Sequence, residues 1–115
     1  MDIDLIRQAI QQSDRFAGRH ANQEAANDDL RIDEIWKSIC AAGAEIIEEY
    51  PDDLRGPSYL ILSFSAGHPI HSVIAYPAKR YAVQRQVQTI AFLITTYRPD
   101  RRPQVWSTDY RTRMP

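Results

Sequence analysis

Histidine and arginine are the residues of this chain whose chemistry suits the handling of a proton or a phosphate. The imidazole titrates near neutral pH and can act as an acid or a base. His71 lies in the strand-like stretch Pro69–Tyr76, where it alternates with Val73 and Ala75. This spacing places the three side chains on one face of a strand. We expect His71 to be either an acid or base on an exposed concave face of a sheet, or a structural histidine bonded across strands.

A second pair of residues suited to acid–base chemistry lies on an expected helix. His20 and Glu24 are four residues apart near the start of an Ala-rich stretch. Residues at this spacing share one face of a helix. The pair therefore suits a base and the group that orients it. The alternative is an ordinary helix face without a chemical role.

Donors for a phosphate follow near the end of the last long apolar stretch. Thr95 and Tyr97 alternate onto one face of a strand, and Arg98 comes next. Tyr97 suits donation to a phosphate or stacking on a base, and Arg98 suits phosphate binding. The alternative is a core tyrosine beside an exposed arginine. The densest basic cluster suits either phosphate contact or a solvated tail, and comprises Arg101, Arg102, Arg111 and Arg113.

Charge is divided unevenly along the chain. Residues 1–54 carry a balance of -8 and residues 55–115 a balance of +7, although the whole chain has a net charge of -1. A basic half of a small domain can serve as a phosphate-binding surface. Alternatively, the two halves attract each other, or the acidic half meets a basic partner.

The spacing of apolar residues predicts helices first and strands afterwards. Helical spacing covers Asp2–Gln12, His20–Asn27 and Asp33–Ala42. Strands are expected at Glu45–Tyr50, Ser58–Ser65, Pro69–Tyr76 and Val87–Tyr97, with a last edge strand at Val105–Tyr110. Residues 13–19 are expected to end the first helix, and Pro77–Gln86 to form a loop or a hairpin tip. This order predicts one α+β domain over residues 1–115, with two to three helices packed on a four- to five-stranded antiparallel sheet.

Composition excludes several classes of protein. The chain has 115 residues, of which 43% are hydrophobic and 25% charged, as is usual for one globular domain. A single cysteine, Cys40, excludes a disulfide framework and a Cys-rich zinc site, and is expected in the core with Trp36 and Ile39. His68 is expected on the strand face opposite His71, so the two do not form a chelate. We expect no metal and no cofactor.

Neither a membrane span nor a secretory signal is evident in the sequence. No apolar run reaches the roughly 18 residues that a membrane span needs. The N-terminus is acidic, whereas a secretory signal is basic and contains a compact apolar block. We expect a soluble cytoplasmic protein without membrane association.

Four short blocks resemble the DUF4258 family of small bacterial proteins. The matching residues are His20–Ala21 with Glu45–Asp53, Ser58–Leu62, Gly67–Val73, and Ile94–Asp100 with Trp106. Their order and spacing fit from about residue 16 to residue 113 and leave only the first helix, residues 1–13, outside. The resemblance implies a fold like that of RelE-type ribonuclease toxins.

The resemblance also implies a function. It points to a toxin of a toxin–antitoxin module that cuts RNA without a metal and has a cognate antitoxin as partner. His71 would then act as acid or base, and His20 with Glu24 would form the second catalytic pair. Tyr97 would act beside them, and the RNA phosphate would meet Thr95, Arg98, Arg101 and Arg102. The alternative is a non-catalytic module that uses the same sheet to bind a protein.

The sequence departs from the family pattern beside the first histidine. Family members carry arginine four and eight residues after it, where this chain has Glu24 and Asp28. His68 stands where arginine or lysine is frequent. The loss of two cations favours the interaction module, whereas the basic second half favours RNA.

Overall fold

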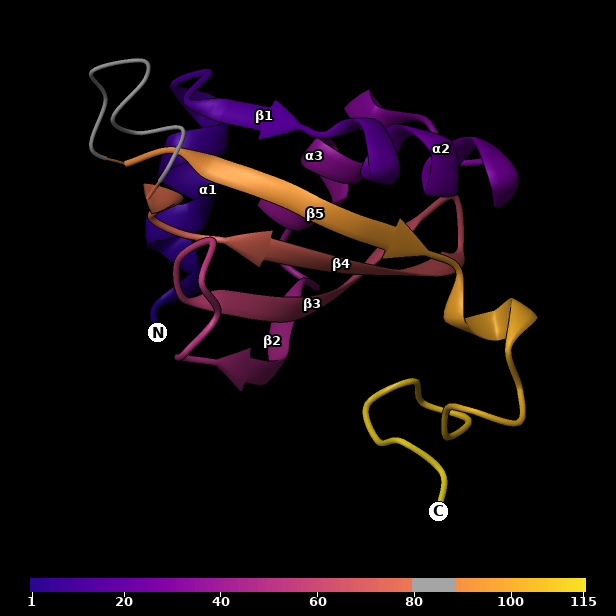
Figure 1. The fold of residues 1–115 in the computed structure, drawn as a ribbon. Coiled ribbons are helices and arrows are strands. Elements are labelled where there is room, and N and C mark those ends of the chain that lie inside the picture. Colours follow the sequence, from indigo (N-terminus) through magenta and orange to yellow (C-terminus); the bar gives the residue numbers. More distant parts are fainter. Residues whose placement is uncertain (80–88) are drawn as a thin grey trace.

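Three helices pack against a five-stranded sheet in the computed structural model, which describes residues 1–79 and 89–115 (Figure 1). The helices are α1 (Ile3–Gln11), α2 (Arg19–Asn27) and α3 (Ile32–Cys40). The strands are β1 (Arg15–Ala17), β2 (Glu45–Tyr50), β3 (Ser58–Ser65), β4 (His68–Ala75) and β5 (Ala91–Tyr97), followed by the 3-10 helix η1 (Pro99–Arg101). The predicted α+β class is confirmed, and so is the change from helix to strand near residue 43.

The sheet is mixed, which corrects the expected antiparallel arrangement. Its strand order is β1-β5-β4-β3-β2, and β1 runs parallel to β5, with Phe16 opposite Phe92. Residues 13–19, expected only to end the first helix, therefore contain a strand. Three residues are too few to show an alternating pattern. The chain reaches this position through a turn in which Ser13 adopts a left-handed φ of 63°.

The main core lies between the helices and one face of the sheet. In α1, Asp2 caps the N-terminus by accepting a hydrogen bond from the Asp4 amide at 2.9 Å, while Ile6 and Ile10 are buried. Each helix buries a stripe of side chains at helical spacing. These stripes meet alternate residues of the strands in one cluster that includes Ile35, Ile39, Ile61, Ile70, Ile74 and Leu93. The opposite face of the sheet is therefore left for other contacts.

The C-terminal residues do not form the expected edge strand at Val105–Tyr110. They fold as an irregular loop that returns on itself, with Ser107 N donating to Thr112 O at 2.8 Å and Met114 N to Val105 O at 2.7 Å. A single bridge joins Trp106 to Arg113. β5 ends at Tyr97, and η1, which begins at Pro99, takes the chain out of the sheet. Residues 103–113, here called the C-terminal segment, therefore do not extend an edge. Part of the expected stretches Val87–Tyr97 and Pro77–Gln86 lies outside the described residues.

Candidate functional site

His71 lies on the sheet face away from α1 and α3, but it is not exposed. Its side chain is fully buried, so the expectation of an open position is wrong. The Trp106 ring covers it edge-on, with ring centroids 4.3 Å apart, and the Tyr97 ring meets it at 5.3 Å. The strand alternation gave the correct face, but the cover comes from a segment 35 residues further along the chain.

Both ring nitrogens of His71 have partners. Nε2 lies 2.8 Å from the Tyr110 carbonyl and Nδ1 lies 3.1 Å from the Tyr97 hydroxyl. Because a carbonyl only accepts, Nε2 carries the proton and Nδ1 accepts from Tyr97. Burial raises the pKa of Tyr97, which keeps the phenol protonated as this bond requires. The structural alternative of a histidine bonded across strands is therefore present, while a catalytic role stays a prediction.

A carboxylate and a second phenol lie on the same face. Glu48 accepts two hydrogen bonds from Arg113, at 3.0 and 3.1 Å, and one from the Tyr50 hydroxyl. Burial alone would raise the pKa of Glu48, but the bonds from Arg113 and Tyr50 outweigh it and hold that pKa below its ordinary value. Glu48 and Arg113 also act electrostatically on His71. We call Glu48, Tyr50, His71 and Tyr97 the sheet-face cluster.

The arginines expected to bind phosphate are all engaged in ion pairs. Arg98 pairs with Asp100 at 2.7 Å and Arg101 with Asp29 at 3.1 Å. Arg102 pairs with Asp28 at 2.7 Å and lies over the Tyr97 ring, 4.8 Å from its centroid. Nη1 of Arg102 donates to the Asp28 carboxylate and to the Arg98 carbonyl. Its other N–H groups make no hydrogen bond to a described residue.

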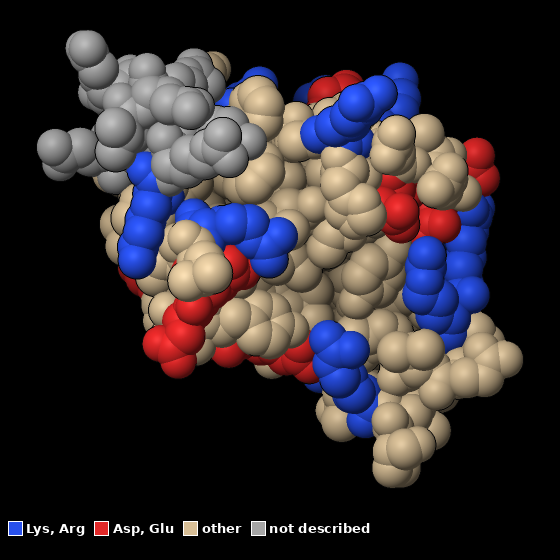
Figure 2. Space-filling view, viewed as in Figure 1, with Lys and Arg blue, Asp and Glu red and all other residues tan. Residues whose placement is uncertain are grey.

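The unequal charge halves of the chain attract each other, as one of the sequence-based alternatives predicted. The ion pairs that join the two halves are Arg55–Asp53, Arg101–Asp29, Arg102–Asp28, Arg111–Glu45 and Arg113–Glu48. On the face shown in Figure 2, basic groups accordingly border acidic ones and do not form one continuous surface.

Asp28, compared above with an arginine of the resembled family, is the acceptor of an ion pair. It is 7% exposed and accepts from the Arg98 amide and from Arg102, both at 2.7 Å. Burial would raise the pKa of Asp28, but these two bonds outweigh it and lower the pKa. Asp28 therefore ties the end of α2 to the chain that follows β5.

The second predicted pair is not joined to His71. His20 and Glu24 lie on α2, which continues from β1 along the outer side of β5 (Figure 1), and neither side chain makes a hydrogen bond or ion pair with a described residue. Thr95 pairs with Val73 and so shares the face of His71, as expected. His68 lies three residues from His71 in β4 and influences Glu34 of α3, in agreement with the opposite face.

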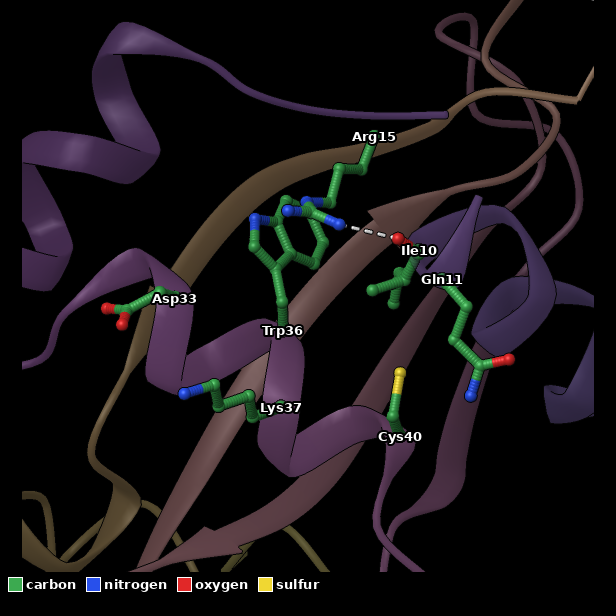
Figure 3. A pocket seen from close by; sticks show the side chains of 7 residues that line it. All are labelled: Ile10, Gln11, Arg15, Asp33, Trp36, Lys37 and Cys40. Carbon is green, nitrogen blue, oxygen red and sulfur yellow. Dashed lines mark hydrogen bonds between the residues drawn. The ribbon is translucent and has the colours of Figure 1, made fainter. Parts of the chain in front are cut away.

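A cavity of about 310 Å³ lies on the helix side of the sheet and has no link to this cluster (Figure 3). Trp36 and Ile10 form its apolar walls, and Arg15 closes one end by donating to the Ile10 carbonyl at 2.6 Å. Burial raises the pKa of the Cys40 thiol, against the influence of Arg7 and Arg15. A protonated thiol is a poor nucleophile, so this cavity carries no evident catalytic group.

A family comparison matches residues 18–98, from the start of α2 to the end of β5. The chain belongs to the DUF4258 family, a domain of unknown function. No curated protein and no solved structure matches it. The DUF4258 match contains every member of the sheet-face cluster but leaves out α1 and the C-terminal segment. Within the described ranges, no helix has both the length and the apolar character needed to cross a bilayer.

Sequence reasoning missed two cluster members of the DUF4258 domain and the two residues that cover it. Glu48 and Tyr50 were noted only as matching residues, although their i, i+2 spacing in a strand places them on one face. A bulge between Ile46 and Glu48 sets which face that is. Trp106 and Arg113 carry no local signal, because their contacts with His71 and Glu48 join distant parts of the chain.

The buried imidazole should make the stability of the domain depend on pH. Burial lowers the pKa of His71 to about 4, against its bond to Tyr110 and the charge of Glu48, which raise it. The unfolded chain, with a pKa of about 6.5, then binds more protons between pH 4 and 6.5, so stability should fall as the pH drops through this window.

We expect a loss of about 2 kcal/mol in the free energy of unfolding between pH 7 and pH 5. The His71→Gln variant keeps a donor for the Tyr110 carbonyl and should lose this dependence. Urea denaturation of both proteins at the two pH values measures the difference. An equal loss of unfolding free energy in wild type and variant would show that His71 does not cause the pH dependence.

Proposed function

We propose that this DUF4258 domain is a metal-independent ribonuclease that acts on RNA in the cytoplasm as the toxin of a toxin–antitoxin module. The sheet-face cluster carries this proposal, because it gathers a carboxylate, an imidazole and two phenols on one face of the sheet. These are the groups that RNA cleavage without a metal needs: a base, an acid and donors to the phosphate.

The cluster supports an assignment of roles. The Glu48 carboxylate removes the proton of a ribose 2′-hydroxyl, and the 2′-oxygen attacks the adjacent phosphorus. The bond from phosphorus to the 5′-oxygen breaks, and protonated His71 donates a proton from Nε2 to that oxygen. Tyr97 and the unused N–H groups of Arg102 stabilise the charged phosphorane. The products are a 2′,3′-cyclic phosphate and a free 5′-hydroxyl.

This mechanism requires a different state of the site from the one described above. With a pKa of about 4, His71 is neutral at pH 7 and cannot donate the second proton. Contact with a phosphate and solvent in place of Trp106 would restore the imidazolium, because an adjacent anion and hydration both favour the charged form.

A non-catalytic interaction module is the second candidate, and a specific observation favours it. Arg98, Arg101 and Arg102 are already paired with carboxylates, which leaves less positive charge for RNA. In this alternative the sheet face holds a protein partner, and His71 has a structural role.

The experiment is a cleavage assay with a single-stranded RNA that contains all four nucleotides. We expect fragments that end in a 2′,3′-cyclic phosphate, detected by mass spectrometry, with an unchanged rate in EDTA. An oligonucleotide of the same sequence with 2′-deoxyribose at each position should stay intact, because it lacks the nucleophile. Failure of the chain to cut RNA, both as wild type and with the C-terminal segment displaced as described below, would leave the interaction module.

A further inference from the structure

The C-terminal segment covers the sheet-face cluster and binds the polar groups of His71 and Glu48. Its Trp106 ring packs against the His71 imidazole and is itself only 3% exposed. Its Tyr110 carbonyl accepts a hydrogen bond from the protonated Nε2 of His71 at 2.8 Å. Its Arg113 donates hydrogen bonds to both carboxylate oxygens of Glu48. Every one of these contacts uses a group that the proposed reaction needs free.

The segment is attached to the domain by the contacts of Trp106 and Tyr110 with His71 and by two ion pairs with β2. It contains no helix and no strand of the sheet. The Arg111–Glu45 and Arg113–Glu48 pairs have half-exposed arginines. Exposed ion pairs hold weakly and are screened by salt. The Trp106 ring is the main apolar anchor.

The segment contributes no residue to the main core. The family match covers residues 18–98 and does not extend over the segment. The main core is built between α1, α2, α3 and the sheet and contains no residue after Leu93. The pair of Arg102 with Asp28 anchors the chain just before the segment begins.

We propose that residues 103–113 are an autoinhibitory segment that competes with single-stranded RNA for the sheet-face cluster. Trp106 occupies the place of an unstacked base over His71, and the Tyr110 carbonyl occupies the place of the leaving oxygen. Single-stranded RNA fits this exchange because unstacked bases pack on exposed rings, whereas paired bases do not. The part of this proposal that concerns RNA rests on the proposed function; the displacement of the segment does not.

The test uses the full chain with Arg111→Glu and Arg113→Glu together. The new carboxylates face Glu45 and Glu48 and repel the segment from β2. The matched control is Arg31→Glu with Lys37→Glu, which makes the same charge change at two exposed positions of the α3 region. Circular dichroism establishes that each variant is folded. Trp106→Ala, which removes the cover but keeps both ion pairs, is the second opening variant.

The first readout is independent of RNA. Diethyl pyrocarbonate modifies accessible imidazoles, and peptide mass spectrometry gives the rate at each histidine. His20 is exposed and serves as the internal reference. We expect His71 to react at least tenfold faster, relative to His20, in the opening variants than in wild type or control. Equal His71 rates in all four folded proteins would overturn the autoinhibitory segment.

The second readout is the rate of RNA cleavage. We expect kcat/KM to rise at least tenfold in the opening variants, because a larger fraction of molecules is competent to bind. If His71 becomes reactive in the opening variants but no variant cleaves RNA, the C-terminal segment covers His71 and the proposed ribonuclease activity is wrong. Cleavage by wild type at a rate that the opening variants do not raise would retain the ribonuclease and overturn autoinhibition.

Discussion

Replacement of Glu48 with glutamine is expected to slow RNA cleavage by roughly 10²–10⁴-fold, the usual contribution of a general base. Glutamine has the size of glutamate and still accepts from Tyr50, but it cannot remove the proton of the 2′-hydroxyl. RNA affinity should change little, because the phosphate donors stay in place. Single-turnover rates and binding isotherms separate the two effects. The measurement is made in the Arg111→Glu, Arg113→Glu chain, where no arginine occupies Glu48.

The control for this prediction is the neighbouring glutamate of β2. Glu49 lies on the other face of the strand, opposite Tyr59, and pairs with the N-terminal amine at 3.2 Å. Glu49→Gln should leave the cleavage rate within about twofold of its parent, since it removes one exposed ion pair. If Glu48→Gln cleaves RNA at the rate of its parent, Glu48 is not the general base. Glu24 would be tested next, because it was the carboxylate paired with His20 in the sequence-based prediction.

Asp28→Arg is expected to lower the free energy of unfolding by about 3 kcal/mol, near the cost of breaking a buried ion pair. The substitution places a third guanidinium beside Arg98 and Arg102 and removes the acceptor of the Arg98 amide. For a domain of this size the melting temperature should fall by more than 10 °C, at roughly 4–8 °C per kcal/mol. Thermal denaturation followed by circular dichroism measures the change.

Glu24→Arg provides the matched comparison, because it makes the same change of charge on the same helix. Glu24 is half-buried and pairs with no described residue, so stability should change by less than about 0.5 kcal/mol. An Asp28→Arg variant as stable as wild type would mean that the ion pair does not hold the end of β5.

The sequence predicted those elements whose pattern is local. β2 and β3 have the expected bounds. Pro51 follows β2, Pro57 precedes β3, and β3 is largely a run of apolar residues. β1 was missed, because its three residues pair with β5 more than 70 positions away and the pairing leaves no mark in the sequence. Val105–Tyr110 was expected as a strand, but it forms a loop whose Trp106 ring lies on the sheet face.

The candidate site was predicted in part for the same reason. Alternation along β5 placed Thr95 and Tyr97 on one face, which the structure confirms, and the pairing of β4 with β5 adds His71 to that face. Nothing in the alternation shows what covers a face. The pairs Glu48–Arg113 and Asp28–Arg102 join residues 65 and 74 positions apart, so the state of each arginine depended on the fold.

The place of β5 in the sheet has a consequence for protein synthesis. β5 is the last of the five strands in chain order, yet it lies between β1 and β4 and contributes Tyr97 to the sheet-face cluster. A sheet with such distant pairing closes late, because loop-closure entropy is lost before the contacts form. The nascent chain therefore cannot form the His71–Tyr97 contact before residue 97 has left the ribosome, and the sheet-face cluster is completed only after the other four strands have been synthesised.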